Sequence, residues 1–174
     1  DLGGGTFDIS VLRVDDDFFE VLSTAGDTFL GGDDFDIAIM DHLIEDLRSS
    51  TGIDLSSRYV ARAKIREAAE NVKIALSSAK TAPIYIPNLA RDEQGSPLHL
   101  DTQIDRASFR NLVLPLVQKS FLVVDEALKL ARLTSMQVDQ CLMVGGMTRV
   151  PLIREAVSGY FGKPSMTEMN PDEV

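Results

Sequence analysis

Hydrophobic and polar residues alternate along two neighbouring stretches near the start of the chain, a pattern that favours β-strands. The stretches are TFDISVLRV, residues 6–14, and FFEVLSTAGD, residues 18–27, and acidic residues separate them. The sequence therefore predicts an antiparallel hairpin that turns at Asp15 to Asp17.

A helical period replaces this alternation after the glycine pair at 31–32. Acidic residues open the stretch, and apolar residues then recur every four positions, at Phe35, Ile39, Leu43 and Leu47. Carboxylates are favourable at a helix N-terminus, and glycine commonly ends a helix. We predict a helix from residue 33 to near Gly52.

A second helix is predicted from a cap at Ser56 or Ser57 to about Lys80. At 100° per residue its apolar positions gather on one side, namely Ala61, Ile65, Ala68, Val72, Ala75, Leu76 and Ala79. A narrow stripe lies opposite, formed by Glu70, Lys73, Ile74 and Ser77. Such a stripe is either a surface for a ligand or an ordinary solvated face with a Glu–Lys pair.

The rest of the chain alternates between strand and helix signals. We expect a strand at 82–89, a hairpin tip and return strand at 90–104, a short helix capped by Asp105, a new helix beginning at Pro115, a strand at 140–146 and a helix at 151–162. Because no internal repeat or low-complexity linker separates these segments, any second subdomain is inserted into the first.

Charge narrows the range of partners. The 174 residues carry a net charge of −10, which argues against nucleic acid and anionic membranes as partners, because both need a basic surface. An anionic ligand would need a local site. A single cysteine, Cys141, excludes an internal disulfide and is typical of a reducing compartment.

The motif DLGGGTFD at the start of the chain is suited to phosphate. Three glycines, Gly3, Gly4 and Gly5, let the backbone approach a ligand and aim several amide N–H groups at it. Thr6 adds a hydroxyl donor, and the carboxylates of Asp1 and Asp8 are able to hold magnesium-bound water or orient an attacking water. The alternative is a glycine-rich turn with solvated aspartates.

A second glycine motif, LMVGGMTRVP, has the same layout of an apolar strand, a glycine turn and a helix that starts at proline. Gly145 and Gly146 would let a nucleotide lie against the backbone, and Arg149 would stack on its base or reach a phosphate. The alternative is a strand-to-helix turn with a surface arginine.

Five motifs in order carry a resemblance to a known family: DLGGGTFD, STAGDTFLGGDDFD, AAENVKIALSS, VGGMTRVP and NPDEV. Together they span the chain, which resembles the second half, lobe II, of the ATPase domain of the heat-shock protein 70 chaperones, in their DnaK-like branch. The chain begins on Asp1 and not on methionine, and we expect it to be a piece of a larger protein.

The resemblance implies an α/β fold of the actin-like ATPase class. Residues 1–30 and 113–174 would form a ribonuclease-H-like subdomain, and residues 31–112 would form a smaller inserted α+β subdomain. In the family ATP lies in a cleft between this lobe and lobe I.

The resemblance also implies a site for ATP or ADP with Mg²⁺. Asp1, Thr6 and Asp8 would take part in catalysis, and Asp1 and Asp8 would hold the metal through water. The nucleotide-binding residues would be Gly3, Gly4, Gly5, Gly32, Glu70, Lys73, Ser77, Gly145, Gly146, Arg149 and Asp172. Ile74 stands where many eukaryotic members have an arginine that stacks on adenine, so we expect Arg149 to stack alone.

The implied partners are lobe I and the peptide-binding domain of the parent protein, a J-domain co-chaperone, and a GrpE-like nucleotide exchange factor that grips residues 31–112. We expect the parent to hydrolyse ATP and this chain by itself to be inactive, in a bacterial cytoplasm or an organellar matrix. Two alternatives remain: a lobe of another actin-fold ATPase or sugar kinase, and a module whose activity in isolation is to bind an exchange factor.

Overall fold

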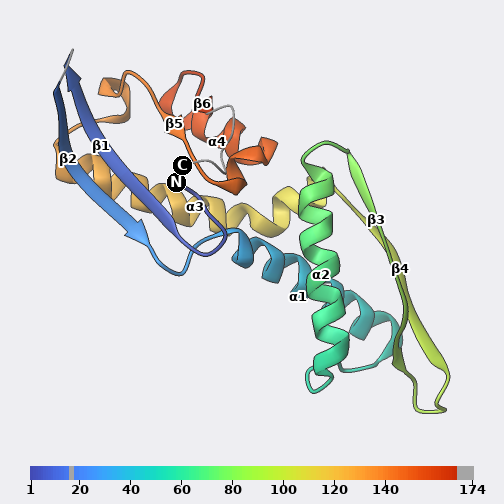
Figure 1. Ribbon diagram of the computed structural model, residues 1–174. Coiled ribbons are helices and arrows are strands. Elements are labelled where there is room, and N and C mark those ends of the chain that lie inside the picture. Colours follow the sequence, from blue (N-terminus) through green and yellow to red (C-terminus); the bar gives the residue numbers. More distant parts are fainter. Residues whose placement is uncertain (16–17, 168–174) are drawn as a thin grey trace. The chain divides into compact units, whose positions relative to one another are not determined.

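The computed structural model describes residues 1–15 and 18–167, and Figure 1 shows the order of the elements. The chain divides into two compact units. Unit 1 comprises Asp1–Asp34 and the chain from Leu114 onward, and unit 2 comprises Phe35–Val113. Two helices, α1 and α3, run across the divisions, so each contributes residues to both units.

Unit 1 contains the predicted hairpin. Strands β1 (Phe7–Asp15) and β2 (Phe18–Asp27) pair antiparallel, from Phe7 opposite Asp27 to Asp15 opposite Phe18, with a register shift between Val11 and Leu12. The predicted hairpin is confirmed. Asp16 and Asp17 of its predicted turn lie outside the described residues.

A short parallel strand pair completes the β structure of unit 1. Strand β5 (Leu142–Met143) pairs with β6 (Met166–Thr167), and helix α4 (Pro151–Phe161) connects them, preceded by a 3₁₀ turn, η2 (Gly146–Arg149). The strand predicted at 140–146 is therefore shorter than expected, because the backbone turns at the glycine pair. Helix α4 begins at Pro151 and is followed by left-handed Gly162, as the sequence predicts.

Helix α3 (Arg106–Ala131) contacts both β2 and α4 with its second half. Ser23 of β2 donates its hydroxyl to the carbonyl of Ala127 at 2.7 Å. On α4, Tyr160 stacks on Phe121, with ring centroids 4.8 Å apart, and donates its hydroxyl to Asp125. Burial and the bond to Asp125 raise the pKa of Tyr160 to about 12.

The single helix α3 corrects one prediction. Asp105 does cap it, because its carboxylate accepts the N–H of Ser108 at 2.7 Å, but the helix does not stop and restart at Pro115. Proline fits the first turn of a helix, and it also occurs in the helix interior at a cost in stability. The sequence signal alone was therefore ambiguous, and the continuous helix leaves Pro115 in its interior.

Unit 2 contains helix α1 (Gly32–Thr51), helix α2 (Tyr59–Leu76) and an antiparallel hairpin of β3 (Thr81–Arg91) and β4 (Pro97–Asp105). The apolar positions predicted for α1 are all buried: Phe35, Ile39, Leu43 and Leu47. One face of β3 is buried as well, through Ala82, Ile84 and Ile86, and β3 contacts α2. The core of unit 2 also includes Leu100 and Ile104 of β4 and Phe109 and Val113 of α3.

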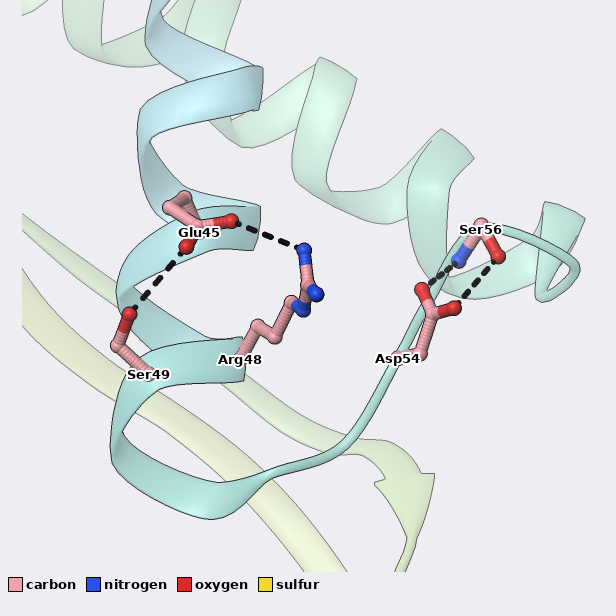
Figure 2. Close-up of polar contacts among 5 residues, drawn as sticks. All are labelled: Glu45, Arg48, Ser49, Asp54 and Ser56. Carbon is pink, nitrogen blue, oxygen red and sulfur yellow. Dashed lines mark hydrogen bonds and ion pairs between the residues drawn. The ribbon is translucent and has the colours of Figure 1, made fainter.

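The connection between α1 and α2 corrects the predicted cap (Figure 2). Glu45 near the end of α1 pairs with Arg48 at 3.6 Å. Asp54 accepts both the backbone N–H of Ser56, at 2.8 Å, and its hydroxyl, at 2.9 Å. The serine is thus held in a turn, and the N-cap of α2 is Arg58, which makes no side-chain cap bond. Those two bonds, the backbone one first, lower the pKa of Asp54.

Helix α2 ends at Leu76, four residues before the predicted end, where the guanidinium of Arg106 binds the last carbonyls. Its Nε lies 2.9 Å from the oxygen of Leu76 and a terminal nitrogen lies 3.2 Å from that of Ser77. The buried face of α2 is Ala61, Ile65, Ala69, Val72 and Leu76. Ala69 takes the place predicted for Ala68, while Ala79 lies beyond the helix and is exposed.

In the described parts of the chain, none of the helices is long and apolar enough to span a lipid bilayer.

Candidate functional site

The glycine motif at the start of the chain forms the end of a narrow antiparallel pair in unit 1. The backbone nitrogen of Asp1 donates to the carbonyl of Asp8 at 2.7 Å, and the N–H of Asp8 donates to the carbonyl of Asp1 at 2.9 Å. Leu2 and Phe7 form an isolated antiparallel bridge. The motif is therefore an extended segment, a tight tip and the beginning of β1.

The tip is closed by a hydrogen bond from the N–H of Gly3 to the carbonyl of Thr6 at 3.0 Å. Gly4, Gly5 and Thr6 are exposed. A Cβ atom built on Gly4 or Gly5 would meet nothing within 4 Å. The backbone of this tip thus faces open space, as a loop that binds phosphate oxygens through its amides requires.

The second part of the site is the glycine pair that begins α1. The N–H of Gly32 donates to the carbonyl of Gly3 at 2.9 Å, and the N–H of Asp33 donates to that of Gly4 at 2.7 Å. A helix N-terminus has no intrahelical partners for its first N–H groups. Here the tip supplies them, and a Cβ on Gly31 would lie 2.5 Å from the carbonyl oxygen of Gly4. Only glycine at 31 permits this approach.

The third part is the motif that contains Gly145. The N–H of Leu2 donates to the carbonyl of Val144 at 2.9 Å, and the N–H of Met147 donates to that of Leu2 at 3.2 Å. Gly145 has φ +94° and ψ 160°, and a Cβ there would lie 2.5 Å from the oxygen of Leu2. The two glycine motifs, far apart in sequence, are therefore joined backbone to backbone.

Two residues of this motif face outward. Gly146 is exposed and has nothing within 4 Å of an added Cβ, and Arg149 is exposed at the end of η2. Thr148, in contrast, is buried and donates its hydroxyl to the carbonyl of Gly145 at 2.8 Å. The threonine fixes the turn, and Gly146 and Arg149 are exposed at its surface.

Asp1 and Asp8 are the two carboxylates of the site. Since they exchange both backbone hydrogen bonds, they lie directly opposite each other, with Cα atoms about 5.5 Å apart and side chains on one face. Both are exposed. Mg²⁺ typically takes one or two carboxylates together with water and substrate phosphates, so the pair fits this metal. Among residues 1–15 and 18–167, no cluster of three or more His, Cys, Asp or Glu side chains could hold a metal ion.

Sequence reasoning missed Gly26, which supports this pair. Gly26 stands opposite Asp8 in the hairpin, and a Cβ there would lie 2.7 Å from Oδ1 of Asp8 and 2.9 Å from the carbonyl oxygen of Phe7. A glycine inside a strand is a signal of close approach and could have identified it.

The next residue, Asp27, pairs with Lys119 at 2.6 Å, a contact that lowers the pKa of Asp27.

The remaining candidate residues lie on α2 in unit 2. Glu70 is exposed, as is Ile74 at 60%. Lys73 is largely buried and its ammonium lies 2.8 Å from Oδ2 of Asp36 on α1. Ser77 is the C-cap of α2, and its hydroxyl donates to the carbonyl of Lys73 at 3.4 Å. The predicted polar stripe thus contains one residue held by a buried carboxylate, which the sequence did not reveal.

Asp172, the last of the predicted nucleotide-binding residues, lies outside the described residues. The other predicted positions divide between the units, with both glycine motifs, Gly32 and Arg149 in unit 1, and the α2 positions in unit 2.

Comparison with known protein families identifies one model, described as Hsp70 protein, that matches residues 1–174.

Proposed function

Because the chain belongs to the Hsp70 family of ATP-binding chaperones, which have an actin-like ATPase fold, we propose that it is the lobe II part of a DnaK-type ATPase domain and binds ATP or ADP with Mg²⁺. In this proposal the parent couples ATP hydrolysis and nucleotide exchange to the binding and release of unfolded polypeptides. The family match favours this function over a sugar kinase.

The observation that carries the proposal is the junction of the two glycine motifs through Leu2. The bonds from Leu2 to Val144 and from Met147 to Leu2 hold the tip of Gly3–Thr6 beside the turn at Gly145. Gly4, Gly5 and Gly146 all have open space where a side chain would be. A nucleotide requires both a cradle for phosphates and a surface for the nucleoside, and this junction supplies backbone for each.

The chemistry assigned to the tip follows from its groups. Backbone N–H groups and the Thr6 hydroxyl donate to phosphate oxygens, and Asp1 and Asp8 orient water for attack on the terminal phosphate. Mg²⁺, when bound, neutralises charge on the phosphates. Phosphoryl transfer depends mainly on positioning and electrostatic stabilisation, and in this proposal the hydrogen-bonded tip and its two carboxylates contribute to both.

The nucleoside end of the proposed site is assigned residue by residue. Arg149 stacks on the base, Glu70, Lys73 and Ser77 bind the ribose and adenine, and Asp172 closes over the nucleoside. We further propose that residues 1–30 and 113–174 form the ribonuclease-H-like subdomain and residues 31–112 the inserted one. The division of the chain into units at 34/35 and 113/114 supports this assignment.

The first test is a calorimetric titration of Mg-ADP into the full-length protein and into a variant with Arg149→Ala and Lys73→Ala. Loss of the Lys73 hydrogen bond is expected to weaken binding about 10-fold or more, since hydrogen bonds to charged groups contribute about 1.5–3 kcal/mol. Loss of Arg149 stacking is expected to weaken binding further, by about 0.5–2 kcal/mol. Lys64→Ala with Arg110→Ala, two exposed positions of unit 2, is the matched control. Equal affinity of the unmutated protein and the Arg149/Lys73 variant would contradict the assignment of these residues to the nucleoside.

We also propose that a GrpE-like exchange factor grips residues 31–112 and that a J-domain co-chaperone acts on the parent. The long hairpin of β3 and β4 offers such a partner an exposed tip at 93–96. Deletion of residues 88–100 is expected to abolish the release of ADP stimulated by the exchange factor, measured with a fluorescent ADP analogue. Unchanged release would exclude the hairpin from the interaction.

A further inference from the structure

A buried ion pair joins the first two helices of unit 2. The carboxylate of Asp36 on α1 and the ammonium of Lys73 on α2 are 2.8 Å apart, and the two side chains are 5% and 13% exposed. Their neighbours along each helix are apolar core residues, Phe35 and Ile39 on α1 and Val72 and Leu76 on α2. A charged pair thus occupies the edge of a hydrophobic core.

Stability alone does not account for such a pair. Desolvation of two charges offsets most of their attraction, and replacing a buried pair by apolar residues of similar size is often neutral or stabilising. The pair does, however, restrict the lysine. The four-carbon side chain of lysine loses conformational entropy when its ammonium is held in one position. Because this entropy is already lost in the free protein, it does not reduce the affinity for a ligand.

The helix that carries Asp36 is itself fixed at the phosphate-binding tip. In unit 1, Gly32 and Asp33 of α1 donate to the carbonyls of Gly3 and Gly4. Asp36 follows three residues later on the same helix. In unit 2 it meets Lys73, one of the residues assigned above to the ribose. Within unit 2, Asp36 therefore holds the side chain of a candidate ribose ligand.

We propose that Asp36 is a positioning residue that holds the ammonium of Lys73 for the ribose hydroxyls of the bound nucleotide. This inference rests on the function proposed above and adds a specificity: the Asp36–Lys73 pair makes binding depend on the ribose hydroxyls. Lys73 touches the nucleotide, and Asp36 acts through Lys73.

The experiment compares the affinity of the full-length protein for Mg-ADP and for Mg-2′,3′-dideoxy-ADP by calorimetry. The parent is expected to prefer ADP by about 10-fold or more, since one hydrogen bond from a charged group has that value. Asp36→Asn, which keeps the size of the side chain, is expected to weaken ADP binding about 10-fold and to leave dideoxy-ADP binding unchanged. The ratio of the affinity for ADP to that for dideoxy-ADP then approaches one.

Four further variants separate positioning from stability. Lys73→Met is expected to lose the preference for ADP, and Asp36→Asn added to it is expected to change the affinity no further, because the two residues act as one unit. Asp46→Asn, an exposed position on the same helix, is the matched control. Asp36→Glu keeps the charge but moves it, and we expect an intermediate preference.

The outcomes distinguish this inference from the proposed function. A folded Asp36→Asn protein with a lower melting temperature and an unchanged ADP preference would overturn positioning and leave a structural role. If Asp36→Asn does not fold, Asp36→Glu decides, because a parental preference in that variant overturns the inference. A parent that binds neither nucleotide contradicts the proposed function itself.

Discussion

At the scale of single residues, adjacent glycines of the candidate site have different physical reasons to be glycine. Gly145 has backbone angles that are essentially restricted to glycine, and its Cα lies against the carbonyl of Leu2. Gly146 has ordinary φ and open space around it. The first glycine is required by the fold, and the second is required only if a ligand approaches.

This difference predicts opposite effects of two neighbouring substitutions. Gly145→Ala is expected to lower the free energy of unfolding by about 1–3 kcal/mol or more, because it adds backbone strain and a clash. At this chain length each kcal/mol corresponds to about 2–4 °C in melting temperature. Gly146→Ala is expected to change stability by less than about 0.5 kcal/mol and to weaken Mg-ADP binding. Thermal unfolding with calorimetric titration checks both. Equal melting temperatures for the two variants would contradict this account of Gly145.

At the scale of elements, helix α3 contains a local conflict between sequence and structure. Pro115 lacks the N–H that would bind the carbonyl of Asn111, and its ring crowds that carbonyl. The helix persists because its neighbours Val113 and Val117 are 0% and 5% exposed and pack into the protein. Burial of an apolar face thus outweighs the local preference of one residue.

The conflict predicts that Pro115→Ala stabilises the protein. Pro115 is exposed, so alanine loses no core packing and restores a hydrogen bond, and the free energy of unfolding is expected to rise by about 1–3 kcal/mol. Chemical denaturation measures the change, and Gln118→Ala, at another exposed position of α3, is the control. A lower stability of Pro115→Ala would mean that packing requires a bend at this residue.

At the scale of the whole molecule, the chain carries more acidic than basic residues, and specific hydrogen bonds stabilise the ionised form of several of its carboxyl groups. The backbone N–H of Ser56 lowers the pKa of Asp54, that of Ser108 lowers the pKa of Asp105, and Lys119 lowers the pKa of Asp27. A carboxyl group with a lowered pKa in the folded state stabilises the fold above its unfolded pKa of about 3.9. This stabilisation is lost as the pH falls through the folded pKa.

The fold is therefore expected to lose stability progressively below about pH 5. A variant with Asp54→Asn and Asp105→Asn keeps an acceptor oxygen at both positions but does not titrate, so its melting temperature is expected to fall less steeply between about pH 5 and about pH 2.5. Melting temperatures measured across this range, for parent and variant, check the prediction. Parallel curves would show that acid acts elsewhere.

The sequence by itself determined the elements whose signals are local. Alternation predicted the hairpin of β1 and β2, the four-residue period predicted the buried face of α1, and proline and glycine marked the ends of α4. These succeed because period and end residues act within a few positions of each other. Two predictions failed for reasons that a local pattern does not contain: α2 ends early, where Arg106 binds its last carbonyls, and core packing continues α3 through Pro115. The serine cap failed for a local reason, because Asp54, two residues before Ser56, holds that serine in a turn.

For the candidate site, the sequence identified residue types suited to phosphate and nucleoside, and only the tertiary structure decided which of them meet. The bonds of Leu2 to Val144 and Met147 join two motifs more than a hundred positions apart, and no local pattern encodes that distance. The same holds for Gly26, whose absent side chain makes room for Asp8, and for Asp36, which the sequence offers as one of several acidic residues. The chemistry of each side chain follows from its residue type and can be read from the sequence. Contacts between segments distant in sequence form only when the core packs, so they depend on the whole tertiary structure.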